Sequence, residues 1–288
     1  MSARAPWRRR CARAALPVAL LAGLVAGCTT LGPTRPVAEL SPAPATFSNA
    51  ALDVVLRRYV DDQGRVDYAG LQAHPQALDH YADLVAAYSP DRTPGLFPTP
   101  ADQLAYWINA YNASVLRGVV AAYPIDSVGD VKPWWPSKAG FFVFQRFVFG
   151  GVTSNLYDLE HDVVRDRSRD PRIHFALVCA SRGCPDLPRA AFDGAVLDVQ
   201  LDQAARRFVA EERNVRIDHA ARRVRLSAIF EWYQSDFLDW PPLAGAPGAT
   251  LLDYIARYAT PDRAADLQRA AGYAIEFAPY DWRLNGRG

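Results

Sequence analysis

The chain has 288 residues, half of them apolar, with 32 basic and 31 acidic side chains. This length and apolar content are enough for one sizeable buried core. The near balance of charge leaves no basic surplus, which argues against a nucleic-acid partner.

The first 28 residues have the layout of a bacterial lipoprotein export signal. Five Arg and no acid precede an apolar run at 14–25, whose 12 residues are too few to span a bilayer, since a spanning helix needs about 20. Cys28 follows Ala26-Gly27, which favours lipid modification; the alternative is a plain secretory signal with a chance Cys. We therefore expect a signal peptide at 1–27 and a membrane anchor through a diacyl thioether on Cys28.

The residues after Cys28 predict where the mature protein lies. Thr29 stands where an inner-membrane retention signal would place Asp, so we expect the periplasmic side of the envelope and sorting to the outer membrane. Loss of the signal removes five Arg, leaving 27 basic and 31 acidic residues and a formal charge of −4. We expect a Pro- and Ala-rich tether to follow the lipidated Cys within 28–46, and one globular domain at 47–288.

The first part of the globule is predicted to be helical. Ser48 is the expected N-cap of a first helix, and Thr99 with Pro100 marks the start of the clearest one. Apolar stripes at helical spacing predict helices over 49–61, 75–88 and 100–122.

The remainder mixes strands and helices. Aromatic and β-branched runs predict one or two strands in 141–152, a buried strand at Arg172–Cys179 before a loop at 180–189, a hairpin of 214–218 with 222–226, and a last strand at 273–277. Caps and apolar stripes predict helices from Thr153 or Ser154 to 166, over 199–212, from Ser227 to Phe237 and from Thr250 to 258. We expect a single α+β domain with helices packed on a small mixed sheet.

Two polar pairs on predicted helices are candidates for chemistry. Asn109 and Asn112 share a helix face, where they either bond neighbouring loop backbone or orient a catalytic or substrate group. Glu160 and His161 are adjacent, and the imidazole can act as a base or a ligand near neutral pH, or pack as a satisfied core residue.

The predicted strand and its loop hold the other candidates. Period-two alternation places His174 on one face with Ala176, and Cys179 on the other. Cys179 and Cys184 are the two Cys left once Cys11 leaves with the signal and Cys28 carries lipid. In an oxidising envelope they favour a disulfide, which would contribute roughly 2 kcal/mol. A free thiol nucleophile with His161 as base, or a metal site with His161 and His174, are the alternatives.

Aromatic residues gather in three short stretches. These are Trp134-Trp135, Glu231-Trp232-Tyr233 and Tyr280-Asp281-Trp282. An exposed Trp pair could grip a sugar or a peptide, whereas buried rings would pack the core and cover its edges.

Together these motifs resemble the domain of unknown function 547 family. The resemblance rests on residues 106–113, 150–151, 159–161, 170–185, 230–237 and 280–285, and covers roughly 50–285. The family implies a single domain and supplies no settled reaction. Its polar motif residues coincide with the Asn, Glu-His and His/Cys clusters, which favours one shared site.

Two function classes follow. One is a thiol-dependent hydrolase or transferase on a peptide-like or cell-wall substrate, with Cys179 or Cys184 as nucleophile, His161 as base and Glu160, Asn109 or Asn112 as orienter. The other is a non-catalytic binding or scaffold lipoprotein with a structural Cys179–Cys184 disulfide. No tight Cys or His spacing supports a metal, so we expect no metal and no cofactor.

Overall fold

The computed structural model describes residues 28–36, 39, 45–131, 139–245 and 247–287. Within these ranges helices dominate, and the strands form two separate three-stranded sheets of mixed direction. The predicted α+β class is confirmed, with two sheets in place of the expected one. The predicted signal peptide and Trp134-Trp135 lie outside the described residues.

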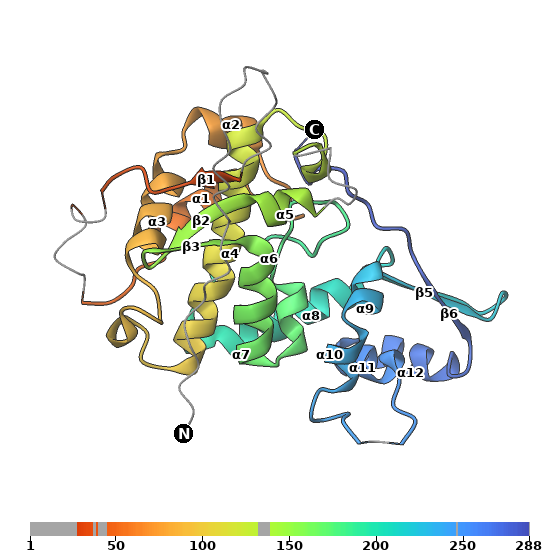
Figure 1. The fold of residues 1–288 in the computed structure, drawn as a ribbon. Coiled ribbons are helices and arrows are strands. Elements are labelled where there is room, and N and C mark those ends of the chain that lie inside the picture. Colours follow the sequence, from red (N-terminus) through yellow and green to blue (C-terminus); the bar gives the residue numbers. More distant parts are fainter. Residues whose placement is uncertain (1–27, 37–38, 40–44, 132–138, 246, 288) are drawn as a thin grey trace, which may run out of the picture.

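The N-terminal half is built around one long helix, α4, which runs through its centre in Figure 1. Side chains from Ala105 to Val119 are buried almost without a break, because neighbouring elements cover α4 on every side. Its start is as predicted: Thr99 and Asp102 form a capping box, and Pro100 is the first helical residue. The helices of this half are α1 (Ala50–Tyr59), α2 (Tyr68–Ala73), α3 (Gln76–Ala87) and α4 (Pro100–Ala122).

The first sheet packs beside these helices. β2 (Gln145–Phe149) pairs with β3 (Val152–Asn155) in antiparallel register and with β1 (Thr29–Leu31) in parallel register. Part of the predicted tether therefore lies against the globule, where Thr34 also donates two hydrogen bonds to Asp83. The first third of the predicted 141–152 strand region is instead a short helix, α5 (Gly140–Phe144).

The middle of the chain departs most from the predictions. The expected helix after β3 is capped by Asn155 and continues as α6 (Leu156–Asp158), a π-helical turn η4 (Leu159–Arg165) and α7 (Asp166–Ser168). The predicted strand Arg172–Cys179 is wrong, because Asp170 caps and Pro171 begins a 3₁₀ helix, η5 (Pro171–Phe175). Its residues are apolar because they are buried, and a short apolar run alone does not distinguish a strand from a helix.

The C-terminal half forms a second unit around the hairpin of β4 (Val215–Asp218) and β5 (Arg223–Leu226), as predicted. β6 (Ala274–Phe277) adds in parallel to β5. The predicted helix from Ser227 to Phe237 is interrupted at Tyr233, which lies between two short helices. The helices of this half are α8 (Leu197–Ala210), α9 (Ala228–Trp232), α10 (Gln234–Leu238), α11 (Leu251–Tyr258) and α12 (Pro261–Arg269), the last of which was not predicted.

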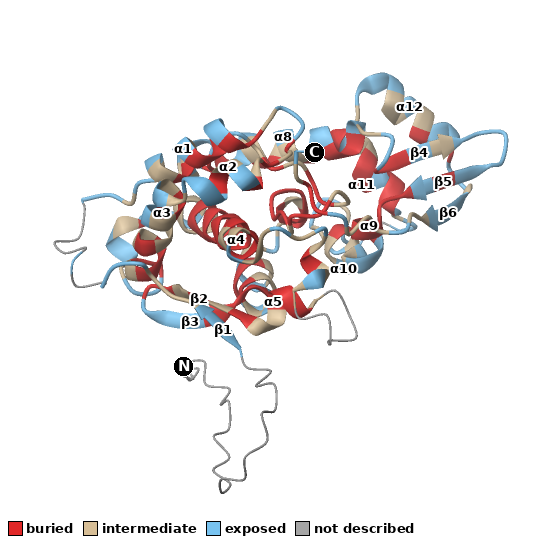
Figure 2. Ribbon diagram, turned by 90° about the horizontal axis from the view of Figure 1, so that it is seen from above, coloured by how far each residue is buried: buried red, intermediate tan, exposed pale blue. Residues whose placement is uncertain are grey.

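The buried side chains form two hydrophobic clusters, and Tyr280 packs against both. Figure 2 marks the buried residues of the two halves in red. After β6 the chain runs back to the N-terminal half, as the blue segment in Figure 1 shows, and we call residues 280–287 the C-terminal strap. The strap bonds the loop after η5, through Arg182 N to Arg283 O and Asn285 N to Ala180 O, and it reaches Val66. No helix of the described residues has the length and apolarity that crossing a bilayer requires.

Candidate functional site

A cleft of ≈ 390 Å³ opens where the two hydrophobic clusters meet. Its aromatic lining comprises Tyr111, Phe142, Tyr157, Trp232, Tyr233, Tyr280 and Trp282. Its polar lining comprises Glu160, His161, Arg165 and His174, with Cys179 and Cys184 beside them. The elements that contribute these side chains are distant in sequence, so the tertiary fold assembles the cleft.

Glu160, on η4, is held by two tyrosines. Tyr111 of α4 donates a hydrogen bond to one carboxylate oxygen at 3.1 Å, and Tyr233 donates to the other at 2.5 Å. Burial, reinforced by the Glu160 charge, raises the pKa of both hydroxyls far above the usual value, so both stay protonated as donors. Glu160 therefore has a fixed orientation in the cleft.

Arg165 links two other polar groups of the site. Its guanidinium forms a bidentate pair with Asp236 of α10, at 2.8 and 2.9 Å, and lies 2.7 Å from Nδ1 of His161. A guanidinium is only a donor, so Nδ1 of His161 accepts and the ring proton resides on Nε2. His161 thus offers the cleft an N–H donor, and its lone pair is already engaged.

His174 lies deeper in the site than the sequence indicated. Its Nε2 donates to Asp236 at 2.7 Å, and its ring stacks on Tyr233 at a centroid separation of 3.8 Å. Burial lowers the pKa of His174, although Asp236 opposes the shift. Burial would raise the pKa of Asp236, but hydrogen bonds from His174 and Arg165 outweigh it and hold that pKa well below its usual range.

Two cysteines beside the cleft are joined to each other. Cys179 and Cys184 form a disulfide with an S–S distance of 2.12 Å, which confirms the predicted pairing. The Tyr280 hydroxyl of the C-terminal strap lies 3.0 Å from each sulfur. The disulfide is thus part of the cleft wall, and neither sulfur is a free thiol.

The predicted asparagines lie next to the cleft without lining it. The amide of Asn109 exchanges two hydrogen bonds with the backbone of Phe192, at 2.8 and 2.9 Å. The amide of Asn112 accepts from Val178 N and donates to Ala176 O, both at 2.9 Å. Because each amide is already engaged by backbone, Asn112 positions the segment that leads to Cys179, and Asn109 positions the chain at Phe192.

One further predicted residue, Cys28, lies outside the cleft. Cys28 is exposed and forms no disulfide. Among the residues that the structure describes, no group of three or more His, Cys, Asp or Glu side chains is arranged to hold a metal ion.

Sequence reasoning did not select Tyr111, Arg165 or Asp236 as site residues, and it selected Tyr233 and Tyr280 only as members of aromatic stretches, not as hydrogen-bonding groups. One signal was available for Arg165, which stands four residues after His161 and therefore on the same helical face. Nothing in the local sequence links Asp236 to His174, because their contact joins two elements 62 residues apart.

Comparison with known proteins gives one match. Residues 98–209 match the model of the family described as "Protein of unknown function, DUF547". No curated protein and no solved structure matches the chain. The matched segment runs from the start of α4 to the end of α8 and holds Glu160, His161, His174 and the disulfide, whereas Tyr233, Asp236 and Tyr280 lie beyond it. Over residues 98–209 the chain is thus similar to the DUF547 family, whose function is unknown.

Proposed function

We propose that the protein is a lipid-anchored component of the cell envelope whose aromatic cleft binds a peptide-like or cell-wall ligand without covalent chemistry. The export pattern that ends at Cys28 supports the anchor and the location. The binding role is supported chiefly by an exposed aromatic platform beside a fixed polar group.

The platform consists of Trp232, Tyr280 and Trp282. Their ring centroids lie 4.7 to 6.0 Å apart, and Trp232 is 47% exposed. An exposed Trp that stacks on other rings beside a cleft presents an apolar face to sugar rings or peptide side chains. Tyr157, 48% exposed, adds a further ring to the lining.

The polar side of the cleft can orient a bound ligand through hydrogen bonds. The Glu160 carboxylate is oriented by Tyr111 and Tyr233, so a ligand hydroxyl or amide can donate to its remaining lone pairs. Nε2–H of His161 offers the complementary donor. Donors and acceptors on an aromatic wall match the mixed polar and apolar faces of peptides and sugars.

A calorimetric titration of the envelope-extracted protein with soluble cell-wall fragments and short peptides tests the proposal. We expect saturable binding that Trp232→Ala weakens by roughly tenfold or more, because truncation removes the centre of the platform. Val199→Ala is the matched control, since Val199 is an exposed apolar residue of α8 outside the cleft. Equal affinities of Trp232→Ala and the wild type would contradict the proposal.

One observation favours a thiol-dependent hydrolase or transferase as the second candidate. Cys179 and Cys184 line the same cleft as His161 and Glu160, so reduction would release two thiols beside them. This candidate requires turnover of the same fragments by reduced protein, and its loss when the nucleophile is replaced, in either Cys179→Ser or Cys184→Ser. It also requires His161 to leave Arg165, because an engaged lone pair accepts no proton.

A further inference from the structure

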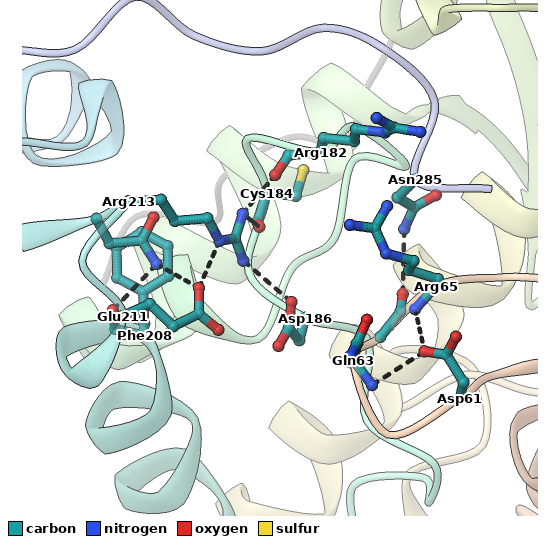
Figure 3. A network of polar contacts seen from close by, with 12 residues as sticks. Asp61, Gln63, Arg65, Arg182, Cys184, Asp186, Phe208, Glu211, Arg213 and Asn285 are labelled. Carbon is teal, nitrogen blue, oxygen red and sulfur yellow. Dashed lines mark hydrogen bonds and ion pairs between the residues drawn. The ribbon is translucent and has the colours of Figure 1, made fainter. Parts of the chain in front are cut away.

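A second and larger pocket, of ≈ 630 Å³, lies on the other side of the loop that contains the disulfide. Cys184 and Pro185 line both this pocket and the aromatic cleft. The opposite wall is the turn at Gln63–Arg65, and the C-terminal strap borders the pocket through Arg283 and Asn285. Figure 3 shows the Cys184–Asp186 loop facing the Arg65 side chain across this space.

The acidic side chains of the pocket are already paired. Asp186 and Glu211 both bind Arg213, at 3.0 and 2.5 Å. Asp62 binds Arg189, which lies outside the lining, and Asp281 binds Arg283. Asp186 and Glu211 share one guanidinium, and the five Arg and four acidic side chains of the lining give the pocket a net formal charge of +1.

Three arginines of the same lining form no direct ion pair within the described part of the chain, although the charges of Arg182 and Arg207 act at longer range on Asp281 and Asp186. Among the described residues, no ion pair joins the guanidinium of Arg65, Arg182 or Arg207 to a carboxylate, and Arg182 Nε reaches only a backbone oxygen, that of Leu284, at 3.4 Å. In Figure 3 the Arg65 guanidinium projects into the space between the turn and the loop. Guanidinium groups preferentially bind carboxylate and phosphate oxygens, so three unpaired ones favour an anion.

A buried hydroxyl provides an independent indication. Ser181 lines the pocket and is only 1% exposed, and its Oγ has no hydrogen-bond partner among the described residues. Buried hydroxyls are almost always bonded, so an orphan that borders a pocket points to a missing partner.

The backbone around these groups is tied in place. Ser181 forms an antiparallel bridge with Leu284, Gly183 N donates to Asp281 O, and Val66 N donates to Asn285 O. The turn, the loop and the strap are thus joined by hydrogen bonds before any ligand arrives, which lowers the entropy cost of binding.

We infer that this pocket is an anion-binding site, in which Arg65 and Arg182, with the Ser181 hydroxyl, receive a carboxylate or phosphate group of a ligand. Arg207 adds positive charge at the rim. The site is distinct from the aromatic cleft, and its existence does not depend on the proposed ligand of that cleft.

Calorimetric titration of the full mature protein with three probes tests the inference. The probes are inorganic phosphate, acetyl-dialanine with a free carboxylate, and the amide of the same peptide. We expect saturable binding of phosphate, of the peptide acid or of both, and no binding of the amide; the responding probe identifies the preferred anion. Binding of the amide as tight as that of the acid, or no binding of either anion, would overturn the inference.

Substitutions locate the site. Arg65→Gln and Arg182→Gln should each weaken anion binding by roughly tenfold to a hundredfold, as expected for hydrogen bonds to a charged group. Arg216→Gln is the control, because Arg216 is exposed on β4 outside the pocket and its replacement changes the charge equally. Affinities of the two pocket variants within twofold of this control would contradict the assignment.

Ser181→Ala separates a ligand-binding role from a structural one. The variant loses no hydrogen bond of the free protein, so its melting temperature should stay equal or rise, while anion affinity falls roughly tenfold. A lower melting temperature with unchanged affinity would show that the hydroxyl serves the fold alone.

Discussion

At the residue scale, the amide of Asn112 shapes the cleft without lining it. It bonds both Ala176 O and Val178 N, which lie in the segment leading to Cys179. The side chain is buried, so water cannot replace these partners. The position of the disulfide in the cleft wall therefore depends on one α4 side chain.

Asn112→Ala should lower the free energy of unfolding by about 2–4 kcal/mol, because it leaves a buried N–H and a buried C=O unsatisfied. Urea denaturation followed by circular dichroism measures the change. Gln203→Ala, at an exposed position of α8, is the control and should stay within about 0.5 kcal/mol of the wild type. If Asn112→Ala lowers the free energy of unfolding by less than that margin, the loop keeps its conformation without the Asn112 hydrogen bonds.

His174 makes stability dependent on pH. Its pKa in the native state is lowered from 6.5 by burial, so below pH 6.5 the unfolded chain binds a proton that the native state resists. Stability from this residue is therefore lost as pH falls from 6.5 toward the lowered native pKa. His174→Gln should remove this loss, at a rate of at most about 1.4 kcal/mol per pH unit.

The measurement compares urea midpoints of the wild type and His174→Gln from pH 7 to pH 5, where the gap between them should narrow. Asp186 has the opposite effect: burial and Glu211 raise its pKa to about 6, so its contribution to the free energy of unfolding is lost as pH rises. Both proteins contain Asp186, so the comparison between them cancels this contribution. A gap that stays constant would mean that His174 takes up its proton equally in both states.

At the scale of elements, helix starts with a complete cap were the most predictable features. Thr99 and Thr250 both form capping boxes with the acid three residues later, and both helices begin where the sequence indicated. These signals are local, since the cap, its acid and the apolar stripe all lie within a few turns.

Thr99→Ala should therefore destabilise the protein by about 1 kcal/mol, because Asp102 N loses its acceptor. Chemical denaturation measures the loss, and Thr99→Ser, which retains the hydroxyl, should recover most of it. Equal stability of the alanine and serine variants would indicate that the Asp102 carboxylate alone caps α4.

The segment Arg172–Cys179 shows why other elements were not predictable. Its apolar run reads as a strand, yet Asp170 and Pro171 start a 3₁₀ helix and the rest packs as irregular chain held by Asn112. The cleft was predictable only in part for the same reason. Glu160, His161, His174 and the cysteines were recognisable as chemical groups, whereas the contacts of Asp236 with His174 and of Tyr280 with Cys179 join elements distant in sequence.

At the scale of the whole molecule, the disulfide loop is the wall that the two pockets share. The C-terminal strap is hydrogen-bonded both to this loop and to Val66 of the N-terminal half. It also places the Tyr280 hydroxyl within hydrogen-bonding distance of both sulfurs. The aromatic cleft therefore forms only when the helices of the N-terminal half, the hydrophobic cluster of the C-terminal half and the C-terminal strap pack together. The proposed binding role requires the Cys179–Cys184 disulfide to stay oxidised, whereas thiol chemistry requires it to be reduced.

Counting free thiols on protein extracted from the envelope tests this account most directly. With Cys28 lipidated and Cys179 joined to Cys184, a thiol reagent under denaturing conditions should find none before reduction and two after it. Two reactive thiols before reduction would contradict the account, since Cys179 and Cys184 would then be unpaired and available as nucleophiles.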